Sequence, residues 1–204
     1  MPTGVAIRDV REQLFDAAER ILLRDGPNAL TTRAVTAEAG CANGVLHRHF
    51  VDFDGFLAEF VLDRIDRLAP QAAALRESAG TGTVAGNLTD ALTALFESVA
   101  VAIVALVTFR DELRARLRQT WPTGVPVLTE AVAMITGYLT AERDQGRIAA
   151  DADVATLAPT LIGAAHLLYA DRTGTPPGAD AVRKMVTTVI GGVVQGSPDE
   201  APRR

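Results

Sequence analysis

The stretch from Thr31 to Phe50, TTRAVTAEAGCANGVLHRHF, constrains the fold of this chain more than any other part. Thr31 is suited to cap a helix, and Gly40 can adopt the positive φ that a tight turn requires. The spacing of apolar residues predicts a short helix on each side of Gly40, over residues 32–39 and 43–49. The apolar residues that would pack these helices are Ala34, Val35, Ala39, Val45, Leu46 and Phe50. Two short helices around a glycine turn are typical of a helix-turn-helix.

The rest of the chain also has helical periodicity, and the composition agrees with it. Alanine and leucine are abundant, aromatic residues make up 5%, and β-branched alternation is scarce. We predict an all-α fold of about nine helices, with a three-helix head in residues 1–52 joined to a helical body in residues 53–197. The remaining predicted helices cover residues 8–25, 53–77, 87–109, 110–120, 127–145, 152–171 and 179–194.

The helix that follows the head carries two local signals. Asp52 is a suitable N-terminal cap, and Val51 and Phe56 have the spacing of a hydrophobic staple. Pro70 lies farther along the same apolar pattern, and proline cannot continue the hydrogen bonding of a helix. We therefore expect a kink or a break at Pro70.

The composition excludes several classes of protein. A single cysteine rules out an internal disulfide framework and a multi-cysteine zinc module. The N-terminus lacks the apolar core of a signal peptide, and the longest apolar run, residues 99–107, is shorter than the roughly 20 residues of a membrane span. We therefore expect a cytoplasmic protein without a membrane partner. The net charge of −5 argues against indiscriminate nucleic-acid binding, and residues 1–55 hold eight acidic and six basic side chains.

A helix-turn-helix places its second helix in the major groove and its first helix across the phosphate backbone. Here, small or polar residues occupy the outward side of the second helix, and the start of the first helix offers a hydroxyl and backbone N–H groups to a phosphate. The residues predicted to contact DNA are Thr31, Thr32, Arg33, Asn43, Gly44, His47, Arg48 and His49. For Asn43, His47, Arg48 and His49 the alternative is a solvated helix face.

Metal binding and catalysis are not expected. Cys41 lies in the turn, while His47 and His49 are two positions apart on a helix and therefore diverge. No Ser-His-Asp order, paired carboxylates or phosphate-binding loop occurs at a useful spacing. We therefore expect neither an enzyme nor a cofactor.

The quoted stretch and the residues after it resemble the DNA-binding head of the TetR (tetracycline-repressor) family of bacterial regulators. The resemblance covers about residues 10–60 and rests on the Thr-Thr-Arg opening, the Ala-Gly turn, the GVLHRHF recognition helix and the long helix that follows. It implies a homodimer that represses transcription and releases DNA when a small molecule binds the body. It also implies that Thr32, Arg33 and His49 lie near phosphates, and that Asn43, Gly44 and His47 approach bases or backbone.

The sequence departs from the family pattern at three positions. His47 stands where the family usually has Tyr, Ala42 where it has a capping Ser or Thr, and Phe53 where it has Lys. A lost cap costs about 1 kcal/mol of helix stability, and a lost phosphate contact lowers affinity and its salt dependence. The resemblance therefore implies an unusual sequence preference or a weak affinity for DNA.

The predicted body offers candidates for a ligand site. These are large or polarizable residues on or beside helices that would enclose a cavity: Phe96, Phe109, Trp121, Met134, His166 and Tyr169. Plain core packing is the alternative for each of them. His166 differs from the others because a buried imidazole needs a hydrogen-bond partner, which a ligand could supply.

The last two predicted helices have an apolar face that two copies of the chain could bury as a four-helix bundle. Its residues are Leu157, Leu161, Ala165, Leu168, Val182, Met185, Val186, Val189, Ile190 and Val193. Burial of the same face against the chain's own body is the alternative.

Two functions stay open at the level of the sequence. The first is a homodimeric DNA-binding transcriptional regulator, a repressor that an apolar or aromatic small molecule releases from double-stranded operator DNA. The second is a small-molecule-binding helical protein with weak or lost specific DNA binding, which the acidic head favours.

Overall fold

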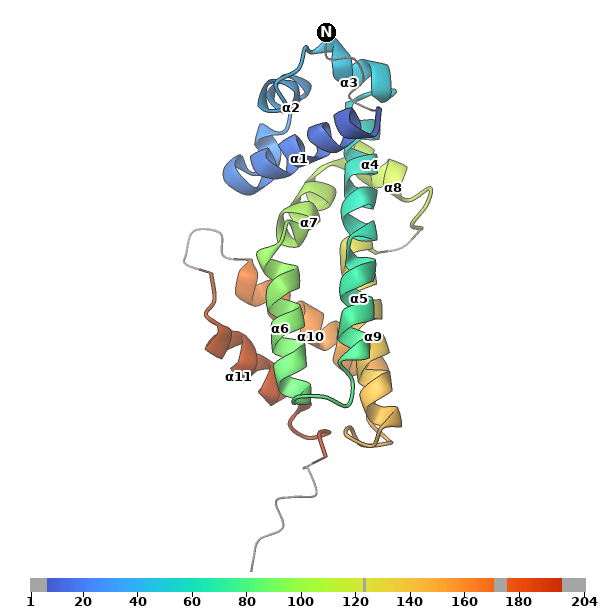
Figure 1. Cartoon of the computed structure of the whole chain (residues 1–204), viewed down its shortest axis with the longest axis vertical. Coiled ribbons are helices and arrows are strands. Elements are labelled where there is room, and N and C mark those ends of the chain that lie inside the picture. The colour runs from blue at the N-terminus through green and yellow to red at the C-terminus, as the bar shows by residue number, and fades with distance from the viewer. Residues whose placement is uncertain (1–6, 123, 171–175, 196–204) are drawn as a thin grey trace, which may run out of the picture. The chain divides into compact units, whose positions relative to one another are not determined.

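The computed structural model describes residues 7–122, 124–170 and 176–195. In these ranges the chain forms eleven α-helices and one 3-10 turn (Figure 1). The β-type pairing recorded there is an isolated bridge between Ile148 and Val194. The predicted all-α fold is therefore confirmed. The predicted ends at residues 171 and 197 lie outside the described residues.

The chain divides into two compact units. The first holds residues 1–66 and 102–127, and the second holds residues 67–101 and 128–204. Each unit is described by itself below. The predicted functional division between residues 1–52 and 53–197 stays a prediction.

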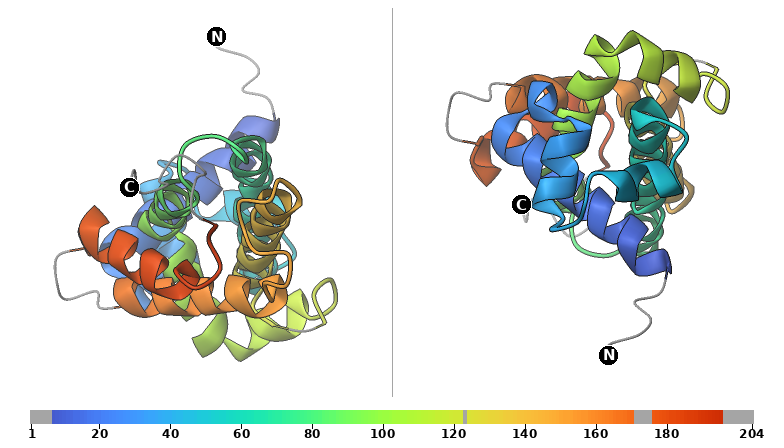
Figure 2. Two further views of the ribbon diagram at one scale, coloured as in Figure 1. Left: turned by 90° about the horizontal axis from the view of Figure 1, so that it is seen from below. Right: turned by 90° about the horizontal axis from the view of Figure 1, so that it is seen from above.

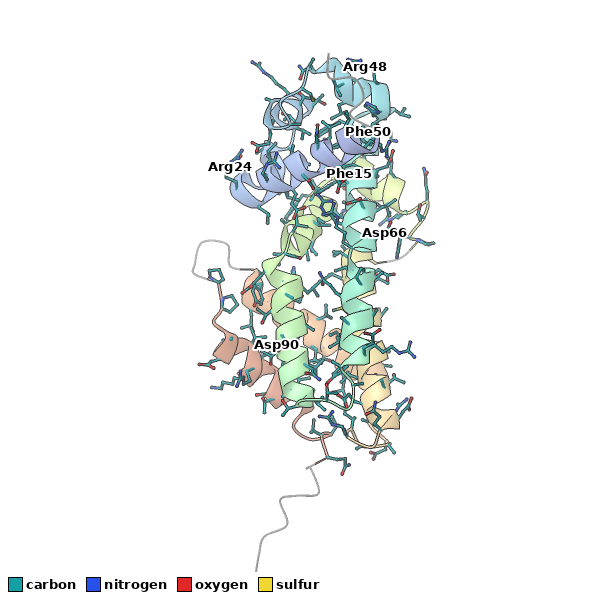
Figure 3. The ribbon with its side chains drawn as sticks, viewed as in Figure 1. Phe15, Arg24, Arg48, Phe50, Asp66 and Asp90 are labelled. Atoms are coloured by element: carbon teal, nitrogen blue, oxygen red, sulfur yellow. The ribbon has the colours of Figure 1, made fainter. Side chains whose placement is uncertain are left out.

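The first unit is built around a cluster of aromatic rings. Phe15 lies 5.7–6.1 Å from the rings of Phe50, Phe56 and Phe60, measured between ring centroids, and all four side chains are buried. Figure 3 labels Phe15 and Phe50. The helices of this unit are α1 (Ile7–Asp25), η1 (Pro27–Ala29), α2 (Thr32–Glu38), α3 (Gly44–His49), α4 (Phe53–Asp66), most of α7 (Ala100–Phe109) and α8 (Asp111–Leu117). The cluster joins α1, α4 and the end of α3, and α2 packs against α1 (Figure 2).

The start of α4 confirms one predicted signal and corrects another. Gly55 donates its backbone N–H to Asp52 Oδ1 over 2.7 Å, so Asp52 caps the helix as predicted. Val51 is 93% exposed and forms no hydrophobic staple. Phe50 and Phe53 pack on Phe56 instead, with centroid separations of 5.0 and 5.6 Å. Two aromatic neighbours already cover Phe56, and this explains why the smaller Val51 is left in solvent.

The predicted helix over residues 53–77 is two helices, as the expected break required. α4 ends at Asp66 and α5 (Leu68–Glu77) follows it. The break lies at Asp66, four residues before Pro70. Proline has no N–H to donate to the carbonyl of Asp66, and the proline ring clashes with that carbonyl.

The predicted helix over residues 87–109 is also two helices, and no break was expected there. α6 (Val84–Glu97) ends at Ser98, whose φ and ψ of −77° and −172° are extended. The Ser98 hydroxyl donates to the carbonyl of Leu95 over 2.5 Å and lies 3.3 Å from the backbone N–H of Ala100. The Ser98 side chain thus bonds to the backbone at the end of α6 and at the start of α7. Such side-chain bonds to nearby backbone groups compete with the hydrogen bonds of a helix, and serine forms them readily.

The second unit surrounds α6. Its other helices are α5, most of α9 (Pro126–Asp144), α10 (Val154–Tyr169) and α11 (Ala179–Ile190). α6 contacts α5, α10 and α11, and its apolar positions are buried among them. Thr83 caps α6 by accepting from Gly86 N, and Asp153 caps α10 by accepting from Thr156 N. The cap at Thr83 starts α6 three residues before the predicted position.

Among the described residues no single helix is both long and apolar enough to cross a membrane, although α6 and α7 reach that threshold when they are counted together.

Candidate functional site

The α2–turn–α3 segment has the local geometry that its sequence predicts. Thr31 accepts a hydrogen bond from the backbone N–H of Ala34 over 3.1 Å and so caps α2. Gly40 has a φ of +69°, in the left-handed region where residues with a Cβ are strained. These two positions fix where α2 begins and how the chain turns toward α3.

Asn43 and Thr36 join the two helices of this segment. The buried Thr36 hydroxyl lies 2.6 Å from Oδ1 of Asn43 and 2.8 Å from the carbonyl oxygen of Thr32. Asn43 stands at the start of α3 but makes no side-chain cap bond there. Its side chain is therefore engaged with α2, and its predicted contact with DNA stays a prediction.

The charges of the head helices are unevenly paired. Of the described arginine side chains on α1–α4, Arg33 has no recorded ion pair or hydrogen bond, and Arg48 has only a 3.5 Å contact from Nε to the carbonyl of Gly44. The other four, Arg11, Arg20, Arg24 and Arg64, pair with carboxylates. The acidic residues paired with arginine are Asp16, Glu19, Asp25, Glu38, Asp52, Asp54, Glu59 and Asp63. The excess of acid in this part of the sequence is thus largely neutralised by ion pairs, while Arg33 and Arg48 stay available to an external anion.

Ion pairing at the α1–α2 contact also changes the pKa of one carboxylate, that of Glu38. Hydrogen bonds from the Arg20 and Arg24 side chains hold the pKa of Glu38 below its usual range. Glu38 therefore stays ionised and keeps both arginines occupied. The charges available on this side of the head are those of Arg33 and Arg48.

The outward side of α3 carries small and polar residues, as predicted. Gly44, His47 and Arg48 are exposed, and Arg48 is labelled at the top of Figure 3. His49 is half-buried, and its carbonyl accepts a hydrogen bond from Arg11 Nη1 over 3.2 Å. This bond attaches the end of α3 to α1.

Gly44 has no role in the packing of the described chain. It lies at the first position of α3 with no positive φ, and a Cβ added there would meet no atom within 4 Å. Glycine at a helical position is less stable than alanine by about 0.5–1 kcal/mol. A glycine without an internal reason on an exposed face indicates close approach by something outside the protein.

Two arginines hold the start of α4, which directly follows α3. Arg116 lies on α8, and Arg110 is the residue before α8. Asp52 pairs with Arg116, and Asp54 pairs with Arg110 Nε over 2.9 Å. The Arg110 guanidinium also lies 5.1 Å from the centre of the Phe53 ring. Sequence reasoning did not assign these arginines a role, because their partners lie more than fifty positions away in the chain.

The comparisons with known proteins agree with this geometry. Residues 14–60 match the bacterial regulatory proteins of the tetR family. The segment that matches contains α2, the turn and α3, the two helices described above. The chain is a DNA-binding transcriptional regulator. Over residues 14–60 it resembles the tetR family, whose members are bacterial regulatory proteins.

Solved structures share the fold over nearly the whole chain. NemR from E. coli in its reduced form matches with a TM-score of 0.72 and 13% identity, covering 91% of this chain and 98% of that one. A TetR transcription regulator from Haloarcula marismortui matches with 0.69 and 17%, covering 93% and 100%. FadR from Bacillus subtilis in complex with stearoyl-CoA matches with 0.65 and 16%, covering 89% and 98%. A comparison with curated proteins found no match.

The second unit contains a cavity of about 330 Å³ between α5, α6 and α9. Its lining is formed by Gln71, Ala74, Leu75, Ser78, Asn87, Asp90, Ala91, Ala94 and Met134. Of the six predicted ligand residues, Met134 alone is among them. The volume of the cavity is at the low end of the usual range for ligand sites, about 300–1,000 Å³. Its lining includes Gln71, Asn87 and Asp90 and is therefore more polar than the apolar or aromatic lining predicted from the sequence.

The structure separates the other predicted ligand residues. Phe96 stacks on Tyr169 with centroids 5.6 Å apart and lies 6.2 Å from His166. By helical phase, Phe96 is on the side of α6 opposite Asn87 and Asp90, so this cluster does not line the cavity. Phe109 and Trp121 belong to the first unit, where Phe109 is 82% exposed.

Sequence reasoning missed Gln71, Asn87 and Asp90 as lining residues. Asn87 and Asp90 are spaced by three positions on a mainly apolar helix and therefore share a side of it, which is the signal that could have identified them. The predicted helix began at Asn87, so this residue was treated as part of its end.

Half of the residues predicted for the dimer face are buried within the chain, and the face stays a prediction. Five of its residues are buried inside the chain, and they are Leu161, Ala165, Val182, Val186 and Ile190. The reason is that α6 packs against both α10 and α11 and takes their apolar stripes. The remaining five, which are Leu157, Leu168, Met185, Val189 and Val193, are half-exposed.

The exposed side of α10 has a different composition. α10 contains no charged residue, and its exposed positions include Thr156, Pro159, Thr160, Gly163 and Leu167, of which Leu167 is 77% exposed. A solvated helix face normally carries charge.

Proposed function

We propose that this chain is a homodimeric repressor that a small molecule releases from operator DNA. The observation that carries the proposal is the exposed face formed by α2 and α3. It combines unpaired Arg33 and Arg48 with a glycine that the protein's own packing does not require. Arginine neutralises phosphates, and a residue without a side chain lets the backbone of α3 approach the DNA closely.

A dimer follows from the way a helix-turn-helix reads DNA. Two recognition helices must reach half-sites about 34 Å apart, which a two-fold pair of chains can supply. The uncharged exposed side of α10 supports this role, because the small residues Gly163 and Thr160 allow close approach and Leu167 gains from burial. This side of α10 replaces the five buried residues as the proposed interface.

The cavity between α5, α6 and α9 is the proposed effector site. It lies in residues 67–101 and 128–204, apart from the DNA-reading face in sequence and in the division into units. A ligand can shift the protein away from its DNA-binding state only by binding another state more tightly. As a regulator of this kind, the protein would act on DNA in the cytoplasm.

The second candidate function is a ligand-binding helical protein with weak or lost specific DNA binding. The departures at His47, Ala42 and Phe53 favour it. One experiment separates the two functions. Double-stranded DNA selected by the protein from a random pool is compared with unselected DNA by fluorescence anisotropy at low salt. We expect the repressor to prefer its selected sites by at least about 10³-fold, the low end for specific DNA-binding proteins.

The arginine substitutions make the test specific to the proposed face. Arg48→Ala should weaken binding to the selected site at least tenfold. Arg76→Ala removes the same charge from the exposed side of α5 in the second unit and should leave binding unchanged. Equal binding to selected and unselected DNA would reject the repressor and select the second function.

A further inference from the structure

We infer that the effector of this chain is a small primary or secondary ammonium compound with an apolar body, held by Asp90. The inference rests on the proposed function, which makes the cavity between α5, α6 and α9 the effector site. It goes further because the lining specifies the charge and the hydrogen-bonding character of the ligand.

Asp90 gives the cavity its charge. It is the one charged side chain of the lining, and within the described residues it has no recorded hydrogen bond or ion pair. Glu97 lies one turn beyond Ala94 on the same side of α6, and Glu130 lies one turn before Met134 on α9. Neither has a recorded partner in the described parts of the chain. Three carboxylates in and beside the cavity favour a cation and disfavour an anion.

The nearest cation along the lining helices does not cancel this field. Arg67 directly precedes α5, one turn before Gln71 and outside the lining, and makes an interaction of its own. Arg76 lies five positions after Gln71, on another side of α5 by helical phase. The lining therefore offers a ligand the Asp90 carboxylate and contains no arginine or lysine.

The neutral polar groups of the lining are mainly acceptors. The Asn87 Nδ2 group donates to the carbonyl of Thr81 and to the Tyr138 hydroxyl, each over 3.0 Å. Tyr138 in turn donates to Glu142, so its oxygen must accept from Asn87, and this fixes the orientation of the amide. Both N–H groups of Asn87 are thus used, and its Oδ1 remains to accept. Gln71 has no hydrogen bond within the described chain, so its amide can either accept a hydrogen bond from a ligand or donate one to it.

A ligand that matches these groups must carry positive charge and N–H donors at one end. The rest of the lining, with Leu75, Met134 and three alanines, is apolar and suits a short hydrocarbon body. An acyl-CoA, such as the stearoyl-CoA in the Bacillus subtilis FadR structure, carries phosphates that this lining would repel. The cavity of this chain therefore selects a ligand of the opposite charge.

Calorimetry with matched probes tests the inference on the full-length protein without DNA. The probes are n-octylamine, n-octyltrimethylammonium, 1-octanol and octanoate, which share a chain and differ in charge and in N–H donors. Asp90 is exposed, so octylamine should bind about two- to fivefold more tightly than octanol, the scale of an exposed charge pair. It should also bind more tightly than the trimethylammonium probe, while octanoate should bind most weakly.

Two variants locate the site. Asp90→Asn keeps the shape of the side chain and should reduce octylamine affinity to that of octanol, whereas Asp151→Asn, at an exposed turn of the same unit, should change nothing. Ala94→Leu fills the cavity from an exposed position and should weaken all the probes. Octanoate binding as tightly as octylamine, an amine preference that survives Asp90→Asn, or no amine binding at millimolar concentration would each overturn the inference.

A separate measurement tests the proposed function. Octylamine is added to the protein bound to its selected DNA. Binding in the cavity without release of DNA would refute the ligand-released repressor and leave the assignment of an ammonium ligand standing. Release of DNA by octanoate but not by octylamine would refute the assignment of an ammonium ligand and leave the ligand-released repressor standing.

Discussion

Gly44→Ala should make the protein more stable and its DNA binding weaker, and this opposition of signs is a direct test of the proposed face. Gly44 begins α3 without a positive φ, and a Cβ at this position meets no atom within 4 Å. Alanine therefore gains from a smaller loss of backbone entropy and introduces no clash. The expected gain in the free energy of unfolding is about 0.5–1 kcal/mol.

The same methyl group should obstruct DNA. If the start of α3 approaches the DNA closely, a methyl group pushed into that contact costs about 1–3 kcal/mol, as overpacking does in a protein core. This corresponds to a loss of affinity of about fivefold to 150-fold. A gain of about 0.5–1 kcal/mol raises the melting temperature of a domain of 60–100 residues by about 2–8 °C.

Two other glycines serve as controls for Gly44→Ala. Gly137 lies inside α9, and an added Cβ there also meets nothing within 4 Å, so Gly137→Ala should raise the melting temperature without affecting DNA binding. Gly40 has a φ of +69°, so Gly40→Ala should lower the melting temperature.

Thermal unfolding followed by circular dichroism and anisotropy with the selected DNA measure the two effects of Gly44→Ala. A stabilised variant with unchanged affinity would refute close approach at Gly44. A Gly44→Ala variant less stable than the parent protein would refute the expectation that alanine at this position reduces the loss of backbone entropy without introducing a clash.

Three further predictions concern other parts of the chain. Arg33→Ala should lower the slope of log affinity against log salt by about one for each protomer, measured by anisotropy between low and physiological salt; an unchanged slope would show that Arg33 contacts no phosphate. Gly163→Leu should convert the dimer to a monomer in sedimentation velocity, and a dimer that persists would exclude this side of α10 as the interface. Hydrogen bonds from the side chain and backbone of Thr156 hold the pKa of Asp153 below its usual range. The carboxylate therefore contributes stability above its unfolded pKa of about 3.9, and this is lost as the pH falls through the lower folded pKa. Asp153→Ala should accordingly lower the melting temperature at pH 7 and match the parent protein at strongly acidic pH; a difference independent of pH would contradict the assignment.

The head was the most predictable part of the chain because its signals are local. Thr31, Gly40 and Asp52 each act on residues within a few positions, and each does what its residue type favours. Their effects can therefore be inferred from the sequence alone. Pro70 also acts locally, and the break it causes lies at Asp66 because the clash reaches back four residues.

The errors arose where distant parts of the chain decide the outcome. The apolar residues of α10 and α11 fit a dimer face and an internal core equally well in the sequence. The position of α6 decides between them, and no local signal records it. The break at Ser98 was missed for another reason, because the surrounding residues continue a helical pattern and one hydroxyl interrupts it.

The charge of the head shows the same dependence on distant residues. Counting residues 1–55 gives a net negative charge, which disfavours DNA, yet Asp52 and Asp54 pair with Arg116 and Arg110 of the same unit. These arginines lie outside the counted window. Pairing, and not the count, determines which charges an approaching phosphate meets.

The pairs at the start of α4 also bear on how the reading face can be controlled. Asp52 and Asp54 lie shortly after α3. Arg116 on α8 neutralises Asp52, and Arg110, just before α8, neutralises Asp54. α7, which leads into α8, begins at Ala100 in the second unit, and α9 after it continues into that unit. A displacement of α8 would leave two uncompensated carboxylates beside the surface proposed to bind phosphates, and like charges repel. The cations that neutralise Asp52 and Asp54 therefore come from residues 102–127, which belong to the first unit and lie outside the predicted head of residues 1–52.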